Sequence, residues 1–140
     1  MPFMRERGFS FVTAMIMAAL IALAVRFAAE QFIAWSISQN EANAVDTLKL
    51  ISTAIENYAG DHLGLYPTNL TALCESKPAY IERSYTKLSA AKGYVFECPV
   101  LDPTGYACQA SPLRCKTTGK TVYRITTGGS RTDQDCGRKR

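Results

Sequence analysis

A chain of 140 residues is long enough for one domain at most, and 47% of its residues are hydrophobic. From Ser36 onward 13 basic residues stand against 10 acidic ones, and three of the bases form the terminal Arg138-Lys139-Arg140. The composition therefore predicts no strongly basic face, and we do not expect the chain to bind nucleic acid.

The N-terminal region contains an apolar run from Phe9 to Val25, which follows the basic residues Arg5 and Arg7. Seventeen residues in a helix span about 25 Å, close to the hydrocarbon core of a bilayer. The run is long for a secretory signal peptide, and no clean polar break follows it. It therefore predicts a single-pass anchor, with Trp35 at the far interface and the remainder of the chain outside the cytoplasm.

The start of this run has a second feature, a short basic leader that ends in Gly8 and is followed by Phe9. It resembles the prepilin leader of type IV pilins and type II secretion pseudopilins. The resemblance implies that a prepilin peptidase cuts between Gly8 and Phe9 and methylates Phe9. It divides the chain into a leader (1–8), a transmembrane and filament-core helix (9–35) and an exported head (36–140). On the leader alone, the alternative is an uncut anchor.

Thr13 departs from the family pattern. The resemblance implies a glutamate at this fifth position after the cut, where it would pair with the N-terminal amine of a neighbouring subunit. A threonine hydroxyl can form hydrogen bonds but cannot neutralise an ammonium group. We therefore expect weak recruitment into a long filament and a role as a minor subunit.

The next segment has helical periodicity on one face only. Apolar residues recur at spacings of three and four, whereas the positions between them are polar. The apolar set is Val45, Leu48, Ile51, Ile55 and Tyr58, and the polar set is Asp46, Lys49, Ser52, Thr53, Glu56 and Asn57. Neither Gly nor Pro occurs between Phe9 and Gly60, so we expect one helix from about Phe9 to Ala59 with Gly60 as its C′ residue.

A loop and a short helix should follow. The stretch IENYAGDHLGLYPTNLTAL resembles the region after the long helix of pseudopilins, and it lies far from the leader. Thr68 is the expected N-cap of the short helix, which should bury Leu70 and Leu73.

The second half of the chain contains strand signals. Strands are expected at Tyr94–Cys98, Tyr106–Ala110 and Thr121–Thr126, with turns at Asp102–Gly105 and Gly128-Gly129. The predicted fold is α+β: a long N-terminal transmembrane-to-amphipathic helix packed against a small antiparallel sheet of three to four strands.

Residues that could carry catalysis are few. His62 is the single histidine and lies beside Asp61, but no nucleophile motif accompanies the pair. Gly128-Gly129 is interpreted as a turn rather than a phosphate-binding loop. We therefore expect a protein that is not an enzyme and that needs no cofactor.

The five cysteines have no CxxC spacing, which argues against zinc, and an exported head favours disulfides. Choosing two bridges among five cysteines leaves about 15 arrangements. A hairpin centred on Gly128-Gly129 would return Cys136 to the level of Thr121, near Cys115. We therefore favour Cys115–Cys136, then Cys98–Cys108, with Cys74 free.

Asp133 and Asp135 resemble part of the acidic loop that holds calcium in major pseudopilins. Two carboxylates supply fewer than the six to eight oxygens that calcium takes, unless backbone carbonyls contribute. Calcium is therefore only a candidate ligand, and no other metal is expected.

Together, these residues predict a structural subunit of a type II secretion pseudopilus or type IV pilus-like filament. The resemblance implies a location in the bacterial inner membrane, followed by a periplasmic or surface filament. Its implied partners are other pilin or pseudopilin subunits, the prepilin peptidase, an inner-membrane assembly platform and membrane lipid. The alternative is an uncleaved, membrane-anchored extracytoplasmic binding domain.

Overall fold

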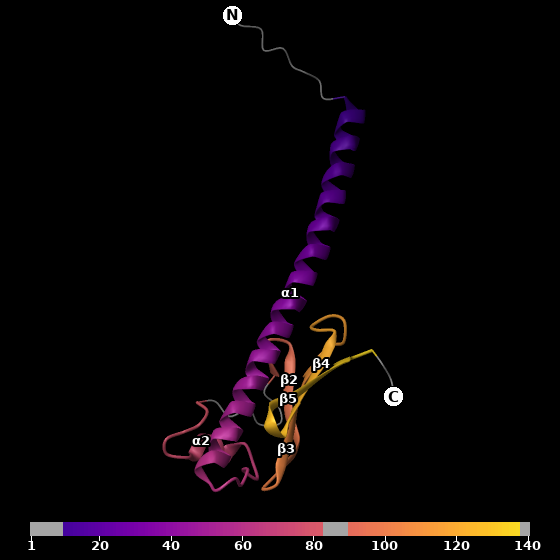
Figure 1. Ribbon diagram of the computed structural model, residues 1–140. Helices are drawn as coiled ribbons and strands as arrows, with labels where there is room; N and C mark the ends of the chain where they lie inside the picture. The colour runs from indigo at the N-terminus through magenta and orange to yellow at the C-terminus, as the bar shows by residue number, and fades with distance from the viewer. Residues whose placement is uncertain (1–9, 83–89, 138–140) are drawn as a thin grey trace, which may run out of the picture. The chain divides into compact units, whose positions relative to one another are not determined.

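The computed structural model describes residues 10–82 and 90–137 (Figure 1). The chain divides into two compact units, Met1–Trp35 and Ser36–Arg140. The elements are α1 (Phe11–Asp61), α2 (Thr71–Glu75), β1 (Ala90–Ala91), β2 (Tyr94–Asp102), β3 (Gly105–Pro112), β4 (Thr121–Thr126), the 3₁₀ turn η1 (Thr127–Gly129) and β5 (Ser130–Asp135). In the second unit, the helix packs on an antiparallel sheet. The predicted α+β fold is therefore confirmed.

The second half of α1 packs against the sheet with one face. Leu48, Ile51 and Ile55 are buried as predicted, and Val45 and Tyr58 lie half-buried at the margin of the core. Small residues complete the buried face: Ala44, Ser52, Ala54 and Ala59. The assignment of Ser52 to the polar face was wrong. Its hydroxyl lies in the core and forms a hydrogen bond with the hydroxyl of Tyr106 at 2.7 Å.

The end of α1 lies beyond the expected residue. Gly60 is still helical, and the helix ends at Asp61. Leu63 and Gly64 then adopt positive φ angles of 58° and 83°, and the Gly64 amide donates to the carbonyl of Ala59 at 2.8 Å. The prediction of Gly60 as the C′ residue was wrong, because the left-handed residues that close this helix come later.

The short helix α2 forms where it was expected, but a different residue caps it. Oδ1 of Asn69 accepts a hydrogen bond from the amide of Ala72 at 2.8 Å, and Thr68 is exposed. Leu73 is fully buried and Leu70 packs at the edge of the core. The cap assignment therefore moves from Thr68 to Asn69, one residue along the chain.

The sheet has the order β1-β2-β3-β4-β5, and every neighbouring pair is antiparallel. Four of its strands are long, and the two-residue β1 extends one edge. The predicted turn at Asp102–Gly105 joins β2 to β3, and the carboxylate of Asp102 accepts the amide of Thr104 at 2.8 Å. At the other hairpin, Thr126 pairs with Ser130 across η1, where Gly128 and Gly129 have φ angles of 78° and 73°. Chain-adjacent strands thus pair throughout the sheet.

The core lies between α1 and one face of the sheet. Alternate residues of β2, β3 and β4 enter it, as the two-residue period of a strand requires. These residues are Tyr94, Phe96, Tyr106, Cys108, Ala110, Tyr123 and Ile125. The opposite face of the sheet carries exposed polar residues such as Glu97 and Arg124.

Candidate membrane anchor and head surface

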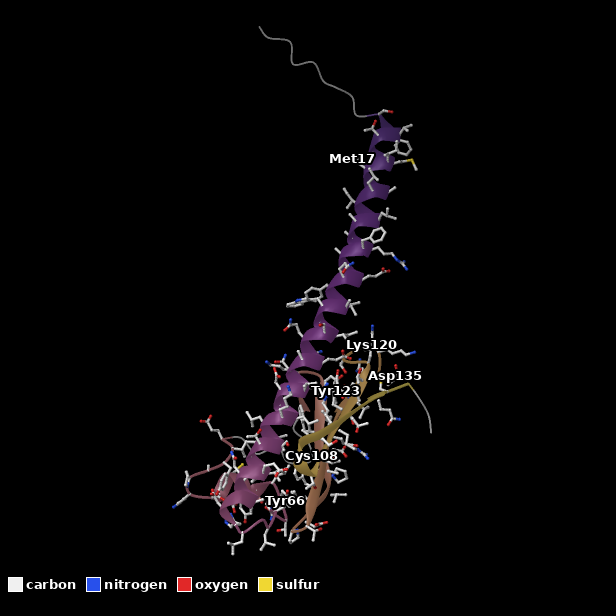
Figure 2. All side chains as sticks on the ribbon, viewed as in Figure 1. Met17, Tyr66, Cys108, Lys120, Tyr123 and Asp135 are labelled. Atoms are coloured by element: carbon white, nitrogen blue, oxygen red, sulfur yellow. A yellow bond between two sulfur atoms is a disulfide. The ribbon has the colours of Figure 1, made fainter. Side chains whose placement is uncertain are left out.

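The first unit presents an apolar helical surface on all sides. From Phe11 to Trp35 every described side chain of α1 is exposed, and large apolar residues dominate (Figure 2, with Met17 labelled). The charged side chains of this segment, Arg26 and Glu30, form an exposed i,i+4 pair at 3.8 Å. By length and composition, α1 can cross a membrane. An all-round apolar helix needs apolar surroundings, so the segment is a candidate membrane anchor.

The residues assigned to processing and assembly lie at the start of this segment. Gly8 and Phe9 lie outside the described residues. Thr13 is in the first turn of α1, where the amide of Ala14 donates to the carbonyl of Ser10 at 3.1 Å. The side chain of Thr13 is exposed, so a neighbouring molecule can reach its hydroxyl.

Two disulfides tie the head together, and both are pairs that the sequence favoured. Cys98–Cys108 joins β2 to β3, and Cys115–Cys136 joins the loop before β4 to the residue after β5. Thr121 pairs with Asp135, and the amide of Cys136 donates to the carbonyl of Lys120 at 2.9 Å. The hairpin therefore returns Cys136 to the level at which it meets Cys115. Cys74 is a half-buried free thiol.

The two candidate calcium ligands lie on a strand and not in a loop. Asp133 and Asp135 are exposed residues of β5, because η1 has already completed the turn. The carboxylate of Asp133 pairs with Arg131 at 3.0 Å, and that of Asp135 accepts the amide of Gly137 at 2.7 Å. Within residues 10–82 and 90–137, no three His, Cys, Asp or Glu side chains gather as metal ligands. The prediction that these aspartates belong to an acidic loop was wrong.

His62 and Asp61 have separate partners in the structure. The His62 ring stacks on Tyr58 with centroids 3.8 Å apart, and its Nδ1 lies 2.8 Å from the carbonyl oxygen of Tyr58. The carboxylate of Asp61 accepts a hydrogen bond from the hydroxyl of Tyr80. These contacts close the end of α1 and give the pair a structural part in the head.

Sequence reasoning missed the role of Glu56. Its carboxylate accepts hydrogen bonds from the hydroxyl of Tyr66 at 3.2 Å, the hydroxyl of Tyr106 at 3.0 Å and the amide of Gly128 at 2.9 Å. One helical side chain thus holds the loop after α1, strand β3 and the turn η1. Burial, and to a smaller extent the negative charge of Glu56, raises the pKa of Tyr106 to about 12. The helical period placed Glu56 on the polar face, but its hydrogen-bond donors come from three other segments: the loop after α1, strand β3 and the turn η1.

None of the protein-family models, curated proteins or solved structures matches this chain.

Proposed function

We propose that the chain is a minor structural subunit of a type II secretion pseudopilus or type IV pilus-like filament, held in the bacterial inner membrane before assembly. The supporting observation is one helix, α1, with two kinds of surface. Its first half exposes apolar side chains all round, and its second half packs on a disulfide-bonded antiparallel sheet. Such a helix can move from lipid into a filament core without leaving apolar surroundings.

In this proposal the chain catalyses no reaction, and its function is assembly. A prepilin peptidase removes residues 1–8, an inner-membrane platform extracts the helix, and the head makes lateral contacts with other subunits. Thr13 supports a minor role, because its exposed hydroxyl cannot neutralise the amine of a neighbouring Phe9. An ion pair in a water-excluded core requires both charges, and here one of them is missing.

Processing after Gly8 tests the proposal. The chain is co-expressed with a prepilin peptidase, and the mass of the N-terminal peptide is measured for wild type, Gly8→Leu and the matched control Gly60→Leu. Gly60 has open space around it, so the control should fold and be cut like wild type. We expect a new N-terminus at Phe9 that only Gly8→Leu abolishes. If all three chains keep Met1, the result would favour the alternative function, an uncleaved membrane-anchored binding domain.

A further inference from the structure

A basic loop lies between β3 and β4. Arg114, Lys116 and Lys120 are exposed, and Lys92, in the turn between β1 and β2, is exposed beside the same end of the sheet (Figure 2 labels Lys120). The amide of Leu113 donates to the carbonyl of Gly93 at 2.9 Å, which brings the loop next to that turn. We call these four basic residues, together with the exposed Leu113, the basic end of the head.

Contacts place the basic end at the beginning of the head's part of α1. Nδ2 of Asn40 donates to the carbonyl of Thr118 at 3.0 Å. The amide of Lys120 donates to Glu41 at 2.8 Å, and the ammonium of Lys92 donates to Asn43 at 3.1 Å. Three hydrogen bonds thus hold the basic end against residues 40–43.

The loop that displays these side chains is held firmly. The Cys115–Cys136 disulfide closes it, and the amide of Lys116 donates to the carbonyl of Gly119 at 2.7 Å. The amide of Arg114 donates to the hydroxyl of Thr118 at 3.0 Å. Because these bonds fix the backbone, the loop is preorganised, and binding costs little backbone freedom.

Charge is distributed unevenly over the head. Five of the ten described carboxylates of the head lie toward the other end of α1: Glu56, Asp61, Glu75, Glu82 and Asp102. The hydrogen bond from Tyr80 to Asp61 and that from the Tyr66 amide to the Pro103 carbonyl bring their segments together there. The carboxylates at the basic end, Glu41 and Asp135, accept backbone amides of Lys120 and Gly137. A nearly neutral composition thus resolves into a basic end and an acidic end.

We propose that the basic end docks on the anionic phospholipid head groups at the surface from which the apolar segment emerges. The inference rests on the membrane anchoring in the proposed function. Asn40 lies five positions after Trp35, a step that spans at most about 18 Å of chain, so the basic end must stay near that surface. Lys and Arg beside an anionic leaflet are attracted to it, and the exposed Leu113 between them suits an interface.

The test uses the full chain in lipid nanodiscs of phosphatidylcholine, with or without added phosphatidylglycerol. Trace acetylation rates of individual lysines are measured by mass spectrometry. We expect Lys116 and Lys120 to react about fivefold more slowly when phosphatidylglycerol is present. The exposed Lys49, on the helix, should not change. At about 1 M NaCl, where the Debye length is about 3 Å, the protection should disappear.

Two charge-matched variants sharpen the test. In Arg114→Gln/Lys116→Gln, Lys120 should lose its protection by phosphatidylglycerol. In Lys49→Gln/Lys77→Gln, which removes two exposed charges elsewhere, Lys120 should keep it. Peptide mapping of the Cys115–Cys136 bridge verifies that both variants fold.

Four outcomes would overturn the docking. Equal reactivity of Lys116 and Lys120 in both nanodiscs would contradict it, as would equal loss of protection in the two variants. If inorganic phosphate or a short DNA duplex protected Lys116 and Lys120 in nanodiscs of phosphatidylcholine alone, the basic end would bind a ligand other than lipid. Release of the chain by alkaline carbonate would contradict the anchor as well as the docking. The processing assay on Gly8→Leu is independent of all four.

Discussion

Replacing Gly119 with alanine tests the packing that holds the basic loop on the core. A Cβ atom at Gly119 would lie 2.5 and 2.6 Å from Cζ and Cε2 of Tyr94, and closer still to its hydroxyl. Tyr94 is fully buried, and its hydroxyl donates to the carbonyl of Thr121 at 2.9 Å. Neither the ring nor the loop can move aside without breaking other contacts.

The expected cost follows from these contacts. Overpacking a well-filled core costs about 1–3 kcal/mol. Loss of the hydrogen bond from Tyr94 to Thr121 adds about 1 kcal/mol. Gly119→Ala should therefore lower the free energy of unfolding of the head by about 2–4 kcal/mol. Gly60→Ala is the matched control: it meets no atom within 4 Å and replaces a helical glycine, so it should stabilise by up to about 1 kcal/mol.

The assay is urea unfolding of the full chain in detergent, followed by the near-ultraviolet circular dichroism of the tyrosines. We expect the midpoint to fall for Gly119→Ala and to stay or rise for Gly60→Ala, with the slope unchanged. In a Tyr94→Phe background the cost of Gly119→Ala should shrink, because the nearest clashing atom has gone. Equal midpoints for the two alanine variants would refute the packing argument.

Three further predictions address the disulfide, the buried tyrosine and the anchor. Cys115→Ser/Cys136→Ser opens a bridge with a sequence separation of 21 and should lower head stability by about 3 kcal/mol, measured by urea unfolding; a change below 1 kcal/mol would contradict it. Because burial and Glu56 raise the pKa of Tyr106 to about 12, its neutral form stabilises the head below about pH 10, and this stability should be lost as the pH rises from 10 to 12. Tyr106→Phe should flatten the pH dependence of the unfolding free energy, and an unchanged slope between pH 10 and 12 would contradict this role of Tyr106. Thr13→Glu should raise incorporation beside a major pilin in sheared filaments; abundant homopolymers of wild type would show that Thr13 is no handicap.

Local signals in the sequence determined most of the elements. The 3.6-residue period located the buried stripe of α1, because the same residues must face the core wherever the helix packs. Turn residues at 102–105 and 128–129 set two of the hairpins: the carboxylate of Asp102 accepts the amide of Thr104, and Gly128 and Gly129 adopt positive φ angles. The hairpin then placed Cys136 opposite Lys120, which made Cys115 its natural partner.

Helix boundaries depended on weaker preferences. Gly60 stayed helical because the closing left-handed turn formed at Leu63 and Gly64, and Asn69 capped α2 in place of Thr68. Helix ends vary by one or two residues, so neighbouring candidates of similar propensity cannot be told apart from local sequence.

Only the tertiary structure decided the contacts between residues that lie far apart in the chain. Glu56 meets Tyr106 and Gly128 because the sheet folds back on α1, and no local pattern records these donors. The same is true of charge. Composition gives one small net charge, whereas folding brings Lys120 beside residues 40–43 and leaves Asp61 at the other end of the head's part of α1. A sequence reports periodicity and turn chemistry directly, but an electrostatic surface exists only after distant segments are brought together, because Coulomb interactions depend on distance in space and not on separation along the chain.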